Sequence, residues 1–240
     1  MVSVDARLRS LVQTYGLPAG SEDKLALLLD LVAASPVSLT TVRDPAEGVE
    51  RHVADSLTGL LVPGLAAADS IADLGSGAGF PGLALAVALP QALVTLVESV
   101  GRKADFLRGA ATELGLGNVT VFAGRAESWT SGLATQAVVT ARALAPLGAL
   151  LEYAAPLLRV DGTLVAWKGP GAADEQADAG HAAGLLAMTT PVAIAVPPGA
   201  AASPGERWLY VSSKVSNTPP GYPRREGMAR KRPIRASGRP

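Results

Sequence analysis

The spacing of apolar positions divides the chain into a helical beginning and a middle in which the period alternates. Near the start, apolar residues recur every three or four positions. This spacing predicts amphipathic helices at residues 4–16, 21–34 and 47–61. From residue 70 onward, short runs of β-branched and apolar residues replace the helical stripes. These runs predict strands at residues 70–74, 93–98, 119–123, 137–140 and 163–167.

Helical segments separate the predicted strands. They lie at residues 81–89, 102–114, 146–158 and 174–188. Strands that alternate with helices favour a parallel sheet covered by helices on both faces. Two later runs, residues 192–196 and 208–212, are joined only by a loop, so we expect an antiparallel pair at the sheet edge. The expected fold is therefore α/β, with a mostly parallel seven-stranded sheet.

These elements suggest three parts of the chain. We expect an N-terminal helical segment over residues 1–62 and a Rossmann-like domain over residues 63–216. The proline-rich stretch 217–223 then leads into an extended tail that ends at residue 240. A chain of 240 residues, 48% of them hydrophobic, is long enough for one core and a small appendage.

Composition excludes several classes of protein. The chain has no cysteine, which rules out disulfides, thiolate metal sites and a cysteine nucleophile, and its two histidines argue against a histidine metal cluster. No apolar run reaches the roughly 18 residues needed to span a bilayer. We therefore expect a cytoplasmic, monomeric enzyme without a metal.

Charge is balanced overall but unevenly spread. Residues 224–240 contain seven lysines and arginines against a single acid, Glu226, whereas the rest of the chain is acidic. A cationic tail on a neutral protein suggests a polyanionic partner such as RNA. The alternative is a solvated, disordered end.

The richest motif is Asp73-Leu74-Gly75-Ser76-Gly77-Ala78-Gly79-Phe80-Pro81-Gly82, which follows the first predicted strand. Gly77, Gly79 and Gly82 match the dinucleotide pattern G-x-G-x-x-G, but the strand ends earlier, so the first glycine after it is Gly75. The carboxylate of Asp73 suits a cationic methionine moiety and would repel a pyrophosphate. The loop therefore favours S-adenosylmethionine over NAD.

Two later acids support a nucleoside ligand. Glu98 ends the second predicted strand, where an acid can accept hydrogen bonds from ribose hydroxyls. Ala126 and Glu127 follow the third strand, at a position that borders the adenine in methyltransferases, so a resemblance to them implies an adenine contact here. Glu127 is also suited to capping the segment that follows.

Further motifs occur in order along the chain. They are Leu39-Thr40-Thr41-Val42-Arg43-Asp44-Pro45, Arg51-His52-Val53-Ala54-Asp55-Ser56, Glu98-Ser99-Val100-Gly101-Arg102-Lys103, Arg125-Ala126-Glu127, Ala141-Arg142-Ala143, Trp167-Lys168-Gly169 and Tyr222-Pro223-Arg224-Arg225-Glu226-Gly227. With the Phe-Pro-Gly extension of the glycine loop, they resemble the ribosomal RNA small-subunit methyltransferase G family, also called glucose-inhibited division protein B. The matches span about residues 39 to 233. One departure is Val37-Ser38, where the family has Tyr-Asn.

The resemblance implies a class I methyltransferase fold and methyl transfer from S-adenosylmethionine to guanine N7 in the decoding region of 16S ribosomal RNA. Guanine N7 carries a lone pair and no proton, so no general base is required. The expected cofactor contacts are Asp73, Gly75, Gly77, Gly79, Phe80, Glu98, Ala126, Glu127 and Arg142. The expected RNA contacts are Arg51, His52, Arg102, Lys103, Lys168, Arg224, Arg225, Arg230, Lys231 and Arg232.

Two of these residues have alternative roles. Arg142 follows the fourth strand, and its guanidinium suits a cofactor carboxylate, an RNA phosphate, guanine O6 or a structural salt bridge. His52 is equally suited to an RNA contact and to a place in the core. We also expect truncation after Tyr222 to weaken RNA binding and to spare cofactor binding.

Two other functions fit the same fold. An NAD-dependent oxidoreductase would need a proton-transfer pair such as Tyr-x-x-x-Lys, and Tyr210 with Lys214 has that spacing only within a predicted strand. A non-catalytic RNA-binding module would retain the basic tail without turnover. Binding of S-adenosylmethionine against NAD, and methyl incorporation into 30S subunits, separate the three.

Overall fold

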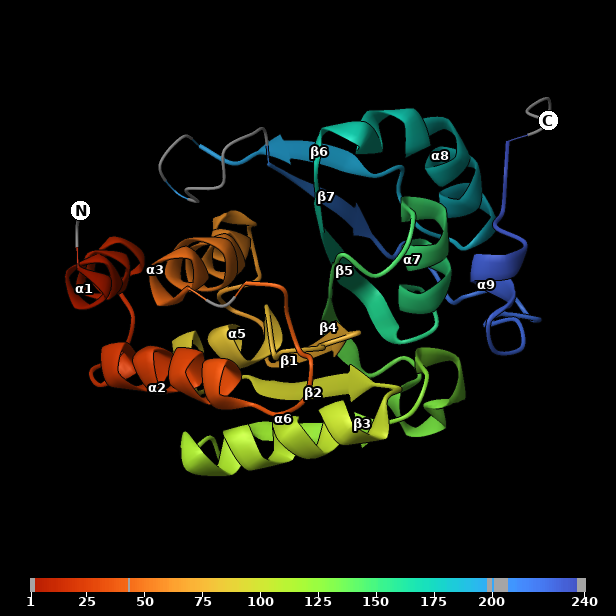
Figure 1. Ribbon diagram of the computed structural model, residues 1–240. Coiled ribbons are helices and arrows are strands. Elements are labelled where there is room, and N and C mark those ends of the chain that lie inside the picture. Colours follow the sequence, from red (N-terminus) through yellow and green to blue (C-terminus); the bar gives the residue numbers. More distant parts are fainter. Residues whose placement is uncertain (1–2, 43, 198–199, 201–206, 237–240) are drawn as a thin grey trace.

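The computed structural model describes residues 3–42, 44–197, 200 and 207–236. Its centre is a seven-stranded sheet with the order β3-β2-β1-β4-β5-β7-β6 (Figure 1). The strands are β1 (Ser70–Leu74), β2 (Leu93–Glu98), β3 (Val119–Ala123), β4 (Gln136–Arg142), β5 (Leu158–Lys168), β6 (Val192–Ala195) and β7 (Trp208–Ser213). The first five are parallel, while β7 runs antiparallel to both β5 and β6. The predicted sheet and its antiparallel edge pair are confirmed.

Helices cover both faces of the sheet, and each face has its own hydrophobic cluster. One cluster packs α1 (Val4–Tyr15), α2 (Ser21–Ala34), α5 (Gly82–Ala88) and α6 (Gly101–Glu113) against one side. The other packs α7 (Leu147–Ala154), α8 (Gln176–Leu185) and α9 (Met228–Lys231) against the opposite side. Neighbouring residues of one strand, such as Ile71 and Ala72, belong to different clusters because side chains alternate along a strand.

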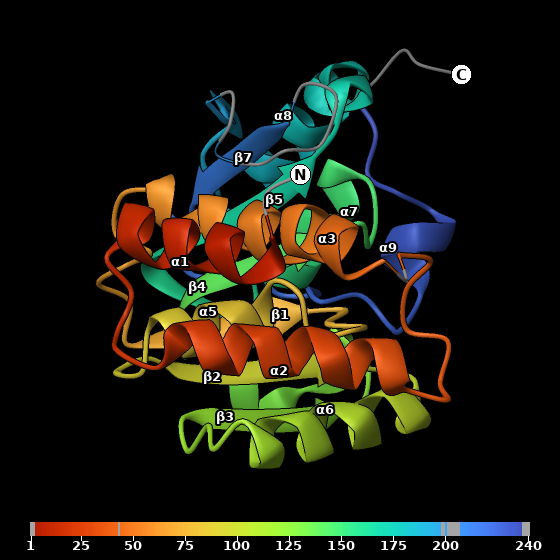
Figure 2. The same cartoon turned by 60° about the vertical axis from the view of Figure 1, so that its left-hand side comes forward.

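The N-terminal helices share the core of the sheet domain. Figure 2 shows α1, α2 and α3 (Pro45–Gly48) side by side. The Asp44 side chain caps α3 by accepting from the Glu47 amide. The predicted helix 47–61 is in fact α3, a π-helical turn (Val49–Ala54), α4 (Asp55–Leu57) and a 3₁₀ turn (Thr58–Leu61). The π-helical turn carries His52 and borders the site described below.

Several predicted boundaries were wrong. The helix expected over 146–158 ends at Ala154, because Pro156 has no amide hydrogen to continue the helical hydrogen bonds, and β5 then begins at Leu158 rather than 163. The helix expected over 174–188 begins as a 3₁₀ turn (Pro170–Glu175) before α8. The described chain has two further 3₁₀ turns, Ala126–Ser128 and Thr130–Gly132.

The C-terminal segment is packed, not extended, over its described part. Ala229 of α9 is buried, and Arg224 Nε donates to Glu152 Oε1 at 2.6 Å, on a buried carboxylate of α7. The expectation of an extended tail over 217–240 is therefore wrong as far as Ala236, because α7 offers this segment an apolar face and an ion-pair partner. Arg239 of that tail, and Arg43 of the N-terminal motif, lie outside the described residues.

None of the helices in the described ranges is long and apolar enough to cross a membrane.

Candidate active site

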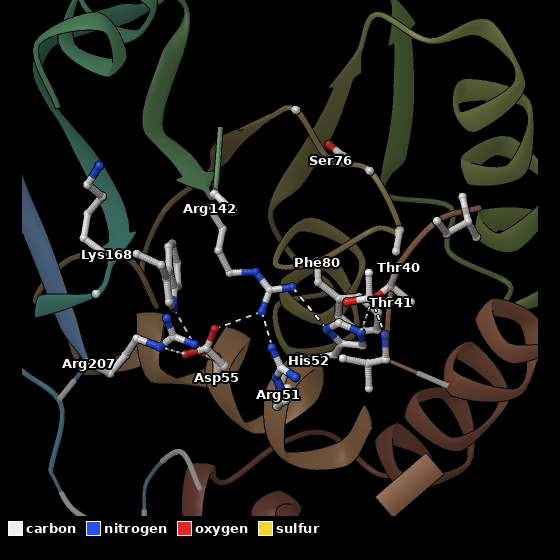
Figure 3. Close-up of a pocket in the computed structure, with 18 of the residues that line it drawn as sticks. Thr40, Thr41, Arg51, His52, Asp55, Ser76, Phe80, Arg142, Lys168 and Arg207 are labelled. Carbon is white, nitrogen blue, oxygen red and sulfur yellow. Dashed lines mark hydrogen bonds and ion pairs between the residues drawn. The ribbon is translucent and has the colours of Figure 1, made fainter. Parts of the chain in front are cut away.

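Two cavities meet at Gly75, at the carboxyl ends of the parallel strands. The narrow pocket, of about 180 Å³, is bordered by residues that follow β2 and β3 and by Arg230 of the C-terminal segment. The wide cleft, of about 670 Å³, is bordered by the loops after β1, β4 and β5 and by the N-terminal segment (Figure 3). Ligands of open α/β sheets bind at this edge.

The glycine loop between the cavities depends on residues without a side chain. Gly75, Gly77 and Gly79 all have positive φ, which L residues rarely adopt. A Cβ at Gly75 would also lie 2.7 Å from Leu144 Cδ1. The loop is held to the next strand, since the Gly75 amide donates to the Val97 carbonyl at 2.8 Å. The floor between the two cavities is therefore bare backbone.

Asp73 lies beneath the loop and not in either cavity. Its side chain is fully buried, with Oδ1 accepting from the Thr140 hydroxyl at 2.9 Å and Oδ2 from the Gly82 amide at 3.1 Å. Burial raises the pKa of this carboxyl, and the hydrogen bonds partly offset that rise. The expectation that Asp73 faces a ligand is wrong, because its oxygens are used to hold the loop and the start of α5.

Glu98 braces the loop from the second strand. Its Oε2 accepts from the Gly77 amide at 2.9 Å and its Oε1 from the Val100 amide at 2.8 Å. Each carboxylate oxygen has a second lone pair, so a ribose contact remains chemically open. Val97 and Ser99, its neighbours in sequence, border the narrow pocket.

The narrow pocket combines the segment after β3 with the C-terminal segment. Ala126 and Glu127 border it together with Tyr153 of α7. Glu127 Oε1 accepts from the Gly227 amide at 2.9 Å, so the C-terminal segment orients this carboxylate. Burial, followed by the charge of Glu127, raises the pKa of Tyr153 and keeps its hydroxyl protonated.

Arg142 and Asp55 form the centre of the wide cleft. Arg142 Nη1 donates to Asp55 Oδ2 and to the Arg51 carbonyl, both at 2.9 Å. Asp55 is fully buried, and its other oxygen, Oδ1, lies 2.9 Å from Arg207 Nε in a second ion pair. Figure 3 shows Asp55 between the two arginines. The salt-bridge role weighed for Arg142 is thus present, and Nε–H and one hydrogen on Nη2 remain free of these bonds.

His52 joins Arg142 to Thr40. Its Nδ1 lies 3.4 Å from Arg142 Nη2, and its Nε2 lies 3.1 Å from the Thr40 hydroxyl. The ring stacks on Phe80 with centroids 4.8 Å apart. Burial, reinforced by Arg142, lowers the pKa of His52 to about 4, so the ring is neutral at physiological pH. His52 forms part of the wall of the wide cleft and is nearly buried.

Comparison with known proteins identifies the family. A family model described as rRNA small subunit methyltransferase G matches residues 23–193. The chain belongs to this family. It is 39% identical to the Ribosomal RNA small subunit methyltransferase G of Rubrobacter xylanophilus, covering 96% of this chain and 91% of the relative. It is 45% identical to the enzyme of the same name from Roseiflexus sp., covering 82% and 84%.

Solved structures with low sequence identity share the fold. Cofactor-bound Rv0187 from MTB superposes with a TM-score of 0.56 at 19% identity, covering 81% of this chain and 91% of that one. The predicted O-methyltransferase Atu636 from Agrobacterium tumefaciens gives 0.52 at 23% identity, covering 68% and 81%. The predicted class I fold, the methyltransferase activity and S-adenosylmethionine as cofactor are confirmed by family and fold together.

Several cations predicted to bind RNA already have partners within the methyltransferase. Lys168 Nζ contacts Glu175 at 2.9 Å and the Ala145 carbonyl, Arg51 pairs with Glu47, and Arg224 pairs with Glu152. The structure therefore gives Arg224 an anchoring role that the sequence did not suggest. Exposed cations remain at both ends of the site. They are Arg102 at the start of α6 and Arg225, Arg230, Lys231 and Arg232 around α9, with Lys103 half-buried.

The wide cleft also includes residues that were not expected as site residues from sequence, among them Thr40, Asp55 and Arg207. Thr40 and Asp55 stand inside quoted motifs, so their place in those motifs was the available signal. Arg207 lies just before β7, far from the glycine loop in sequence, and belongs to none of the quoted motifs.

Proposed function

We propose that this methyltransferase acts on N7 of a guanine in the decoding region of 16S ribosomal RNA, within the small subunit or its precursor. The observation that supports the proposal is the meeting of two unlike cavities at Gly75. The narrow pocket suits a nucleoside, and the wide cleft is bordered by Arg51, Arg142, Lys168 and Arg207. Cations around an open cleft suit a phosphate backbone.

The residues of the narrow pocket fit S-adenosylmethionine. Gly75 borders both cavities and carries no side chain, so a ligand can cross from one cavity to the other at this point. Ala126 and Glu127 would hold the adenine edge, Glu98 the ribose, and Gly75, Gly77, Gly79, Phe80 and Arg142 the remainder. When bound, S-adenosylmethionine supplies a methyl group on a positively charged sulfur.

Positioning is the main task left to the protein. Guanine N7 has no proton to lose, so a base is not needed, and the acids of the site are engaged elsewhere. Asp73 supports the loop and Asp55 lies between two arginines. Arg142 keeps donors available for a phosphate or a guanine edge. A guanine splayed out of the RNA could then be held in line with the cofactor.

Methyl incorporation into 30S subunits tests the proposal. Unmodified subunits are incubated with the protein and methyl-labelled S-adenosylmethionine, and the digested RNA is analysed by mass spectrometry. We expect one 7-methylguanosine per subunit, in the decoding region. Label in another nucleoside, or in no RNA, would contradict the proposal. The matched controls are Gly75→Asp, which should abolish the signal, and Gly115→Ala, which lies far from both cavities.

Assembly and location remain predictions. We expect a monomer in the cytoplasm that acts on the particle, and we expect Arg102, Lys103 and the cations around α9 to contact its RNA. Size-exclusion chromatography with light scattering checks the monomer, and comparison of naked 16S RNA with 30S subunits checks the substrate.

A further inference from the structure

Thr40 borders the wide cleft with its hydroxyl held in a defined hydrogen-bonding state. The Val42 amide donates to Thr40 Oγ1 at 3.1 Å, and His52 Nε2 lies 3.1 Å from the same oxygen (Figure 3). The amide can only donate. The direction of the second bond depends on where His52 carries its proton.

Arg142 decides the tautomer of His52. A guanidinium has only donors, so the 3.4 Å contact between Arg142 Nη2 and His52 Nδ1 requires Nδ1 to accept. Burial and Arg142 also lower the pKa of this ring to about 4, which keeps it neutral. We therefore assign the single proton of the neutral ring to Nε2, so that Nε2–H donates to Thr40 Oγ1.

Both acceptor positions of the Thr40 hydroxyl are then occupied. A hydroxyl oxygen has two lone pairs and one hydrogen, so this group can only donate. No acceptor receives that hydrogen in the part of the chain that the structure describes, although the side chain borders the wide cleft. The contacts from Arg142 through His52 thus leave the Thr40 hydroxyl, at the border of the cleft, as a donor without an acceptor among the described residues.

We propose that Thr40 is a specificity-determining residue that donates to O6 of the target guanine and disfavours adenine. The inference rests on the proposed function. Guanine presents two neighbouring acceptors, N7 and O6, whereas adenine presents N7 beside an amino group that donates. A hydroxyl that can only donate binds O6 and opposes the amino group of adenine. Because O6 is adjacent to N7, the same bond orients the reacting atom.

A substrate–variant cycle tests this pairing. Subunits are reconstituted with 16S RNA that carries either guanine or 2-aminopurine at the methylated position, since 2-aminopurine keeps N7 and lacks O6. Wild type, Thr40→Val and Thr40→Ser are compared by kcat/KM on each. Thr112→Val, an exposed threonine on α6, controls for the substitution itself.

The expected result is strong coupling between the hydroxyl and O6. On guanine, Thr40→Val should lose about 10- to 100-fold in kcat/KM, while Thr40→Ser should stay within roughly threefold of wild type. On 2-aminopurine, wild type and Thr40→Val should be equal. Calorimetry should give the same S-adenosylmethionine Kd for both proteins, which shows that the variant folds.

Two results would overturn the inference alone. Equal slowing of both substrates by Thr40→Val would indicate a structural role, and unchanged guanine methylation would exclude the contact. A wild-type protein that binds S-adenosylmethionine and does not methylate guanine-containing subunits would overturn the proposed function, and the inference with it.

Discussion

The two cavities beside Gly75 share a floor and differ in their walls. The floor is the glycine loop, which the sheet domain builds from β1 and β2. The wall of the narrow pocket includes the C-terminal segment, through Arg230 and the Gly227–Glu127 bond. The wall of the wide cleft includes the N-terminal segment, through Thr40, His52 and Asp55. Each end of the chain therefore completes one of the two binding surfaces.

The acids of the two regions also differ. Asp73 and Glu98, under the loop, are bonded to backbone amides and to Thr140. Asp55, in the wide cleft, is neutralised by two arginine side chains. Hydrogen bonds from backbone amides fix the shape of the glycine loop, whereas an arginine paired with Asp55 has further N–H donors for a ligand. The comparison suggests that the loop is a rigid support and that the wide cleft is the part adapted to an anionic substrate.

The largest effect is expected at the shared floor. Gly75→Asp places a side chain where Leu144 Cδ1 lies 2.7 Å from the Cβ position, in a backbone conformation with φ +69°. We expect S-adenosylmethionine binding and methyl transfer to be lost together, by about a thousandfold or more in kcat/KM. Calorimetry and methyl incorporation measure the two. Gly115 also has a positive φ, but a Cβ added there would have no atom within 4 Å. Gly115→Ala should therefore cost roughly 1 kcal/mol of stability and leave binding intact. Retained binding in Gly75→Asp would place the ligand elsewhere.

The next effect separates the wide cleft from the narrow pocket. Arg142→Ala removes one of the two partners of buried Asp55 and the donor to His52, so we expect a loss of about 3 kcal/mol in unfolding free energy. Methyl transfer should fall by about 100-fold or more. Arg159→Ala breaks an exposed pair with Asp69, which water screens, and should leave stability almost unchanged. Urea unfolding compares the two variants, and equal losses would count against a buried pair at Asp55.

The C-terminal segment gives a smaller effect and revises an expectation from the sequence. Truncation after Tyr222 removes Arg230 and the Gly227 amide, and it leaves the buried Glu152 without Arg224. We therefore expect weaker S-adenosylmethionine binding, by about tenfold, in addition to weaker RNA binding. Calorimetry on Arg230→Ala, with Arg225→Ala as its control, measures the contribution of the pocket wall to cofactor binding, because Arg225 borders neither cavity. Cofactor affinity that survives truncation unchanged would show that the narrow pocket does not need this segment.

The smallest effect is a pH dependence at His52. Its pKa is about 4 in the folded protein against 6.5 ordinarily, so the unfolded chain takes up a proton at higher pH than the folded chain does. Stability from the neutral ring is complete above about pH 6.5 and is lost as the pH falls toward 4. The loss is at most about 3 kcal/mol. Unfolding at pH 7 and pH 5 should show a steeper change for wild type than for His52→Asn. His181→Asn, at an exposed position of the packed helix α8, should keep the wild-type slope, and equal slopes in all three proteins would exclude His52 as the cause.

The sequence predicted the floor of the site better than its walls. Strand periodicity and the spacing from Asp73 to Gly79 were local signals, so the sheet, the loop and the edge pair followed from them. The direction of the Asp73 side chain was not local, because it depends on Thr140, 67 residues away in sequence. The same limit applies to Arg224, whose partner Glu152 lies on another element. Arg207 entered the wide cleft only through tertiary packing of β7 beside β5.

A crystal structure with bound S-adenosylhomocysteine would show which cavity holds the cofactor. We expect adenine in the narrow pocket between Ala126 and Arg230, with the sulfur at Gly75 and directed toward the wide cleft. That placement leaves the cleft beside Arg142 open for a base. Density for the whole ligand in the wide cleft, with the narrow pocket empty, would contradict the division of the site into a cofactor half and a substrate half.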